Sequence, residues 1–195
     1  MNYINKGKRD IIIIPKFNNI DKIQTVRKKY DELFNVIMPH ITIAFPFDKD
    51  IPNEQLKKQL ENILVNIKPF KIKCKGITLK KDTKVDTYYI FLNLVEGKDE
   101  IKKIHDKVYK NILKDIDLKK YNYEPHITLG NTNNSNEKIK LDEEFVTLID
   151  SIIVERIGEH EESIVEFEIK MKCVNSFWLG HPKNNILTCD LFTLE

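Results

Sequence analysis

Two short segments of the sequence carry the same four residues, Pro-His-Ile-Thr. The first segment, MPHITIAF, contains His40 and Thr42, and the second, EPHITLGN, contains His126 and Thr128. An imidazole titrates near neutral pH, so a histidine can either accept or donate a proton. A threonine hydroxyl can donate a hydrogen bond to an anionic oxygen. Two imidazoles and two hydroxyls around one ligand would therefore suit acid–base chemistry on a phosphate.

Each copy has the composition of a short β-strand, in which successive side chains point to opposite faces. In the first copy His40 and Thr42 would share one face, while Ile41 and Ile43 would point into a core. The second copy has the same alternation. Two related lobes that face each other about a pseudo-twofold axis would bring both His/Thr pairs to one cleft.

The segments around the first copy alternate between strand and helix patterns. Isoleucines follow Asp10, apolar residues recur at helical spacing from Ile20, and apolar residues alternate with lysines after Phe70. β-branched runs and period-two alternation indicate strands, whereas apolar residues three and four positions apart indicate helices. We therefore predict strands over 10–17, 38–47 and 70–81, and helices over 19–37 and 51–67.

The same order begins again in the second half of the chain. The patterns predict a strand over 87–97, a helix over 98–113, a strand through the second copy over 124–132, a short helix over 140–149, and strands over 151–158 and 163–171. This repetition predicts an internal duplication, with pseudo-repeats at roughly 9–81 and 87–158. Because each half is too small for an independent domain, we expect one bilobal domain over 1–172. The apolar residues of the C-terminal extension, 173–195, are expected to pack onto it.

The charge of the chain is nearly balanced, with 32 basic and 30 acidic residues among 195 and a net charge of +2. Such a balance gives no bulk attraction to a long nucleic-acid backbone. It favours a small substrate or the end of an RNA strand. The composition, 41% hydrophobic and 32% charged, is that of an ordinary globular domain. We infer no stable protein partner from the sequence.

Targeting and redox signals are weak. The four isoleucines near the start are too short for a signal-peptide core, and no apolar run has the length of a membrane span. The three cysteines, Cys74, Cys173 and Cys189, are odd in number and lack metal-type spacing. We expect a cytoplasmic protein with reduced thiols and no membrane association.

The remaining histidines lack a duplicated partner. His105 lies among charged residues of the helix over 98–113, which predicts a surface histidine. His160 lies in the acidic turn GEHEES and His181 in LGHPK, so both are predicted to be turn residues.

Several cations and aromatic residues lie near the motif strands. Candidates for positive charge at the cleft are Lys8 with Arg9, Lys80 with Lys81, and Arg156. Some of the aromatic residues would be core, whereas one or two could form a stacking wall for a base. These aromatic residues are Phe45, Phe47, Tyr88, Tyr89 and Tyr123.

With two His-x-Thr motifs on strands, each followed by an apolar residue, the sequence resembles the 2H phosphoesterase superfamily over roughly residues 9–172. That superfamily includes the 2′-5′ RNA ligase-like proteins and the cyclic phosphodiesterases. The resemblance implies an α+β, bilobal fold in which two antiparallel sheets flank a central cleft, with helices on the outside. It also implies that His40 and His126 are the general base and general acid, in an order left open. Thr42 and Thr128 would bind the phosphate, with no metal or other cofactor.

The resemblance favours a metal-independent phosphodiesterase that hydrolyses a 2′,3′-cyclic or related cyclic phosphate of a nucleotide, an RNA end or ADP-ribose. A 2′-5′ RNA ligase would use the same site in the reverse direction, and a non-catalytic module could hold an RNA end or nucleotide there. In a purely structural alternative, the histidines are core residues of two strands that share an ancestor. A metal site is disfavoured because threonine is a poor ligand and no carboxylate or thiolate recurs beside both motifs.

Overall fold

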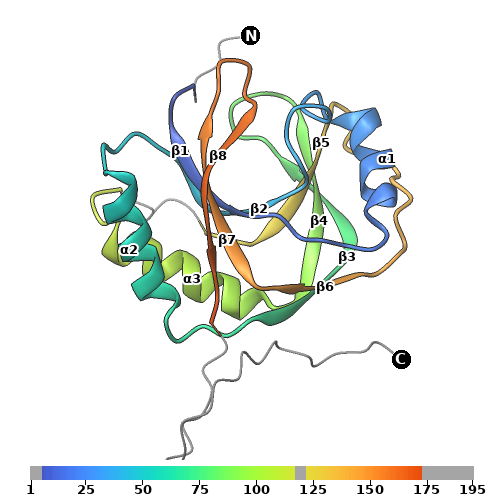
Figure 1. Ribbon diagram of the computed structural model, residues 1–195. Coiled ribbons are helices and arrows are strands. Elements are labelled where there is room, and N and C mark those ends of the chain that lie inside the picture. The colour runs from blue at the N-terminus through green and yellow to red at the C-terminus, as the bar shows by residue number, and fades with distance from the viewer. Residues whose placement is uncertain (1–5, 117–121, 173–195) are drawn as a thin grey trace, which may run out of the picture.

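The computed structural model describes residues 6–116 and 122–172, and within these ranges the chain forms eight strands and three helices (Figure 1). The strands are β1 (Arg9–Ile13), β2 (Ile41–Phe47), β3 (Phe70–Lys81), β4 (Tyr88–Glu96), β5 (His126–Thr132), β6 (Phe145–Ile149), β7 (Ser151–Ile157) and β8 (Ser163–Lys170). The helices are α1 (Ile20–Tyr30), α2 (Asn53–Leu64) and α3 (Lys98–Asn111). A membrane span would need a longer and more apolar helix than any of these three.

The strands form two four-stranded antiparallel sheets, which confirms the predicted α+β fold. One sheet has the order β2-β1-β7-β8 and the other β5-β4-β3-β6. Each sheet therefore begins at a motif strand, β2 or β5, followed by the strand that precedes it in the chain. The third strand of each sheet comes from the other half of the sequence, since β7 pairs with β1 and β3 pairs with β4. This exchange of strands joins the two halves.

One predicted element is wrong. The segment 140–149 was expected to be a helix, but Phe145–Ile149 forms β6, which pairs with β3 from Cys74↔Phe145 to Phe70↔Ile149. Phe145 and Ile149 are both buried, and a separation of four residues fits the helical period as well as the strand period. Among the described residues, the second half therefore lacks the second helix that an exact repeat would contain.

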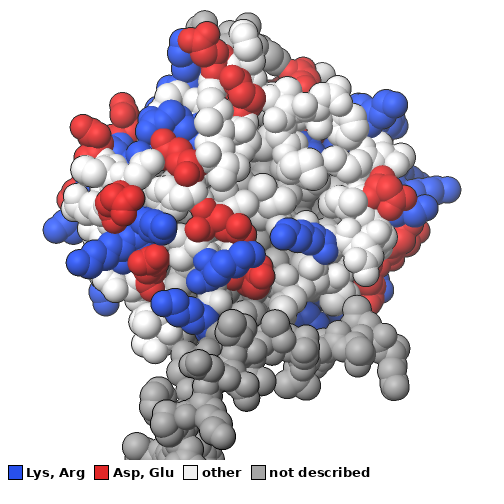
Figure 2. Space-filling view, in the orientation of Figure 1, with Lys and Arg blue, Asp and Glu red and all other residues white. Residues whose placement is uncertain are grey.

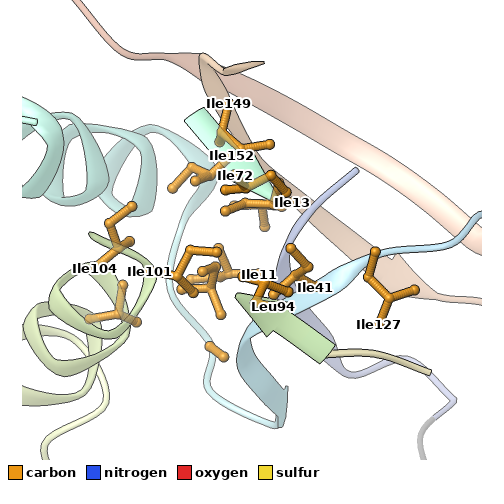
Figure 3. Packing of buried hydrophobic residues seen from close by; sticks show 14 of the residues in the cluster. Ile11, Ile13, Ile41, Ile72, Leu94, Ile101, Ile104, Ile127, Ile149 and Ile152 are labelled. Carbon is orange, nitrogen blue, oxygen red and sulfur yellow. The ribbon is translucent and has the colours of Figure 1, made fainter. Parts of the chain in front are cut away.

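The two motif strands share one hydrophobic core. Ile41 of β2 and Ile127 of β5 are both 0% exposed and belong to one cluster that draws on both sheets and the helices (Figure 3). The helices lie outside the sheets, and α1 packs on β5 whereas α3 packs on β2 (Figure 1). Cys74 is buried in the same core, which raises the pKa of its thiol to about 12. Cys173, Cys189 and the extension 173–195 lie outside the described residues.

Helix α1 ends earlier than predicted, at Tyr30 rather than near residue 37, because Asp31 adopts an extended backbone (φ −117°, ψ 110°). The end of this helix lies directly against β5. A side chain at Gly130, where φ is +123°, would come within 2.1 Å of the Tyr30 carbonyl oxygen. Glycine is therefore required at this position by both its conformation and the close approach of the helix.

Candidate active site

The two motifs have the same alternation of burial. His40 and Thr42 are half-buried, whereas Ile41 and Ile43 between and after them are fully buried. The second motif repeats this pattern, with half-buried His126 and Thr128. Each histidine therefore shares a face with its threonine, as strand geometry requires.

Both motifs contain a β-bulge at the same position. Thr42 lies opposite Ile12, but the next pair joins Ala44 to Ile11, so Ile43 is an extra residue on β2. Likewise Thr128 lies opposite Phe91 and Gly130 opposite Ile90, so Leu129 is an extra residue on β5. A bulge bends a strand and redirects neighbouring side chains, and bulges are frequent beside active sites. The two His/Thr pairs are therefore set at equivalent bends of two edge strands.

The two imidazoles are also held in the same way. His40 Nδ1 lies 2.9 Å from the carbonyl oxygen of Met38, and His126 Nδ1 lies 2.7 Å from that of Glu124. A carbonyl oxygen can only accept, so each Nδ1 carries the hydrogen and donates it. This fixes the tautomer and leaves each Nε2 available to take or give a proton.

Burial lowers the pKa of both imidazoles below the ordinary value. For His126 the positive charge of His40 lowers the pKa further, so the two rings lie within electrostatic reach of each other. For His40 the carboxylates of Glu155 and Asp31 oppose the effect of burial, and the Arg27 guanidinium adds to it. The fold creates this proximity because β2 and β5, each at the edge of its own sheet, lie against each other (Figure 1).

A cleft of about 560 Å³ opens beside the second motif. Its lining contains His126 but not His40, Thr42 or Thr128. The full lining is Phe45, Lys75, Thr78, Lys80, Phe91, Asn93, Leu94, Val95, Lys98, Asn122, Tyr123, Glu124, Pro125 and His126. The cleft therefore extends from the second histidine across the open face of β4 and β3.

An aromatic row forms part of this face. The ring of Phe91 stacks on His126 with centroids 3.6 Å apart and 25° between planes, and Tyr89 stacks on Phe91 at 5.9 Å and 11°. Phe91 carries no sequence signal of its own, because its contact with His126 depends on the pairing of β4 with β5. Phe45 and Tyr123, both predicted candidates, also line the cleft, whereas Phe47 is buried in the core.

The predicted cations divide between the cleft and other places. Lys80 lines the cleft, whereas Lys81 pairs with Asp86 at 3.2 Å and lies 5.8 Å from the Tyr88 ring centroid. Lys8, Arg9 and Arg156 are not part of the lining. Arg9 and Arg156 both pair with Glu166 at 2.7 Å, which gives them a structural role in the first sheet.

His105 was expected on the surface, and this is wrong. Its side chain is 3% exposed, its Nδ1–H donates to the Ile43 carbonyl at 2.7 Å, and its ring stacks on Tyr123 with centroids 3.6 Å apart and 2° between planes.

Two tyrosines also bond to the backbone of β2. The Tyr123 hydroxyl donates to the Thr42 carbonyl at 2.8 Å, and the Tyr109 hydroxyl accepts from the Phe45 N–H at 3.0 Å. Together with His105, the two tyrosines form hydrogen bonds with three backbone groups of β2 at and beside the first motif. We call His105, Tyr109 and Tyr123 the β2 clamp.

Arg27 supports the approach to the first motif in a similar way. It is 1% exposed on α1, pairs with Asp31 at 2.8 Å, and donates to the Ile37 carbonyl at 2.7 Å. The arginine therefore ties the segment before His40 to the helix. In the sequence, Arg27 is followed by two further charged residues, Lys28 and Lys29, so nothing there indicates that its side chain is buried.

His160 is exposed in the turn between β7 and β8, as predicted, and His181 lies outside the described residues. Within residues 6–116 and 122–172, no three His, Cys, Asp or Glu side chains gather closely enough to hold a metal ion together.

Comparisons with known proteins identify the family of this chain. The family model described as the 2′-5′ RNA ligase superfamily matches residues 15–152. A protein of Bacillus licheniformis named "putative phosphoesterase" is 26% identical over 175 residues, which cover 88% of this chain and 94% of that protein. A protein of the same name from Geobacillus kaustophilus is 30% identical over 130 residues, which cover 63% and 68% of the two chains.

The fold is also similar to that of E. coli LigT. The LigT structure with NADP+ has a TM-score of 0.61 and 11% identity, covering 85% of this chain and 98% of LigT. The LigT structure with 3′-AMP has the same TM-score and identity, covering 86% and 99%.

Proposed function

Because the chain belongs to the 2′-5′ RNA ligase superfamily, we propose that it is a phosphodiesterase that opens a 2′,3′-cyclic or related cyclic phosphate, with His40 and His126 as its acid–base pair. The observation that carries this proposal is that both imidazoles have the same hydrogen-bond arrangement. Each donates its Nδ1 hydrogen to a backbone carbonyl, and each leaves Nε2 free.

In the proposed reaction, one neutral imidazole takes a proton at Nε2 from a water molecule as its oxygen attacks phosphorus. The other imidazole, protonated, gives its Nε2 hydrogen to the ribose oxygen as the bond from that oxygen to phosphorus breaks. The hydroxyls of Thr42 and Thr128 would donate to the nonbridging oxygens, where negative charge increases in the transition state. The histidines carry the protons, so this mechanism needs no metal.

A small nucleotide is the substrate class we favour. The LigT structures contain 3′-AMP and ATP, and a related cleft here would accept a ligand of that size. Basic and acidic side chains are interspersed on the visible face of the molecule, without a broad basic field for a long RNA (Figure 2). A cyclic phosphate of a nucleotide, an RNA end or ADP-ribose fits these requirements.

The description of the matching family also favours 2′-5′ RNA ligation as a second candidate. Ligation joins a cyclic phosphate to a 5′-hydroxyl, which reverses the attack on a 2′-5′ linkage. The same acid–base pair would act in both directions.

The test is a panel of nucleoside 2′,3′-cyclic phosphates, ADP-ribose cyclic phosphate, 2′-5′ oligonucleotides and RNA half-molecules, each assayed with and without EDTA. We expect hydrolysis of a cyclic phosphate at the same rate in both conditions. Ligated RNA as the main product would favour the second candidate. Tight binding without turnover would indicate a binding module, and turnover restored only by a divalent ion would indicate metal-assisted hydrolysis.

A further inference from the structure

Three lysines line the cleft, and two of them form ion pairs with acidic residues. Lys75 pairs with Glu144 at 3.1 Å, and Lys98 pairs with Glu124 at 2.6 Å. Lys80 forms no ion pair with any residue in the described ranges. Clefts with low-dielectric walls focus the field of such a charge, so Lys80 makes this part of the cleft attractive to an anion.

The position of Lys80 relative to the second motif follows from the strand register. Lys80 lies opposite Tyr89, Thr78 lies opposite Phe91, and Phe91 lies opposite Thr128. Lys80 is therefore two strands across and two residues along from Thr128, a separation of about 12 Å between Cα atoms at ordinary sheet spacings. A lysine stem can extend over several ångströms of that gap. The aromatic row of Tyr89 and Phe91 lies between the two positions.

We propose that Lys80 binds a second phosphate of the substrate, at the end of the cleft away from His126. This inference rests on the proposed function, which puts the reacting cyclic phosphate at the His/Thr motifs. The preferred substrate would then be a cyclic phosphate that carries another phosphate group, rather than a bare nucleoside cyclic phosphate. The second group is either a 5′-phosphate or the next phosphodiester of an RNA end, and both offer the same anionic oxygens to an ammonium.

The neighbouring lysine supplies a matched control. Lys81 has the same side chain but points to the opposite face of β3, as strand alternation requires, and it pairs with Asp86. Lys80→Ala and Lys81→Ala therefore remove equal charge from adjacent positions. Only the first substitution removes charge from the cleft.

The experiment compares kcat/KM on three substrates: a nucleoside 2′,3′-cyclic phosphate, its 5′-phosphorylated form, and a dinucleotide that ends in the cyclic phosphate. Lys80→Ala should lose on the order of 10-fold or more on substrates with a second phosphate, mainly through KM, as for a lost charge-assisted hydrogen bond. The loss on the bare nucleoside should stay below about twofold, and Lys80→Arg should retain the preference. A loss confined to the 5′-phosphorylated form identifies the 5′-phosphate, and a loss confined to the dinucleotide identifies the phosphodiester.

Equal losses on all three substrates, or the same loss in Lys81→Ala, would overturn the proposal while leaving the proposed function intact. Calorimetry supplies a readout that does not need turnover. Wild type should bind a nucleoside 3′,5′-bisphosphate more tightly than the 3′-monophosphate, and Lys80→Ala should lose that preference. If it keeps the preference, Lys80 does not bind the second phosphate, whatever the protein hydrolyses.

Discussion

The two histidines share one backbone arrangement but have different charged neighbours. Glu155 and Asp31 stabilise the protonated form of His40, whereas His126 is affected by Glu124 and by the opposing charge of His40 itself. Two interacting groups release their protons in steps that belong to the pair, and a first proton on one ring disfavours a second on the other. The pair is thus suited to a state in which one imidazole is neutral and one is protonated.

This arrangement predicts a bell-shaped pH dependence. Burial lowers the pKa of both imidazoles in the free protein, so the maximum of kcat/KM on a cyclic nucleotide should lie below pH 6.5. An anionic bound substrate favours imidazolium, so the alkaline limb of kcat should lie at higher pH than that of kcat/KM. Replacement of His40 or His126 by alanine should slow turnover by about 10²–10⁴ and remove one limb of the bell.

The matched controls are Thr42→Ala and Thr128→Ala, which should slow turnover but keep both limbs, because a hydroxyl does not titrate in this range. Rates measured from pH 4 to pH 9 on wild type and the four variants would test whether the two histidines are the acid–base pair. Near-normal rates with a two-sided bell in both histidine variants would leave the repeated motif as a relic of duplication.

Strand β2 lies at the edge of its sheet, and the β2 clamp covers its free side. An edge strand presents unpaired backbone groups, and proteins usually cover or protect them. Here the carbonyls of Thr42 and Ile43 and the N–H of Phe45 are bonded to Tyr123, His105 and Tyr109. Tyr123 lies three residues before His126, so its hydroxyl connects the approach to the second motif with the backbone of the first.

We predict that Tyr123 positions Thr42 for the reaction. Tyr123→Phe removes one hydrogen bond but retains the ring that stacks on His105, so the protein should fold and kcat should fall by about 3–10-fold. If the hydroxyl acts through Thr42, the same substitution should cost little in a Thr42→Ala background, but its full effect in a Thr128→Ala background. Single-turnover rates for these variants give the coupling free energy between the Tyr123 hydroxyl and the Thr42 side chain.

Tyr109→Phe is the control for general loosening of the strand, since Tyr109 bonds to Phe45 beyond the motif. It should lower the free energy of unfolding by about the same amount as Tyr123→Phe, near 1 kcal/mol, with little change in kcat. Equal losses of kcat in both tyrosine variants, or additive losses with Thr42→Ala, would assign the clamp to stability alone.

The elements that were predictable from the sequence are those with one clear period. The strand over 70–81 and the helix from residue 98 were predicted closely, because lysine alternation and apolar spacing each fit a single structure. β6 was missed because Phe145 and Ile149 fit both periods. The exchange of β3 and β7 between the sheets could not be predicted, since local patterns do not specify which strands pair.

The same limit applies to individual residues of the site. Strand alternation predicted the shared face of each His/Thr pair, because it depends only on neighbours in sequence. The stack of Phe91 on His126 and the burial of His105 depend on contacts between elements far apart in the chain. In both cases the local sequence, charged around His105 and apolar around Phe91, gave no indication of the partner.

At the scale of the whole molecule, the first sheet contains a pair of buried acidic residues. Asp10 and Glu155 lie opposite each other on β1 and β7 and are 5% and 0% exposed. Asp10 shares a hydrogen bond with Glu155, and the hydroxyl of Ser163 donates to the Glu155 carboxylate. Burial, and then the charge of Glu155, raise the pKa of Asp10 to about 8. Two adjacent buried carboxylates cannot both ionise cheaply, so Asp10 keeps its proton.

This pair predicts that the contribution of Asp10 to the stability of the fold falls with rising pH. Folded Asp10 holds its proton until about pH 8, whereas in the unfolded chain it loses the proton near 3.8. Its contribution to stability is therefore fully present below about pH 4 and is lost as the pH rises through about 8, at most about 1.4 kcal/mol per pH unit. His40, His105 and His126 act in the opposite direction, because their lowered pKa values make stability rise with pH, so the pH dependence of wild type alone does not test this prediction.

Asp10→Asn keeps a donor toward Glu155 but cannot ionise, and exposed Asp142→Asn is the matched control. Urea unfolding at pH 5 and pH 8 should show wild type losing stability relative to Asp10→Asn but not relative to Asp142→Asn. If the free energies of unfolding of wild type and Asp10→Asn change equally between pH 5 and pH 8, Asp10 ionises normally in the folded protein.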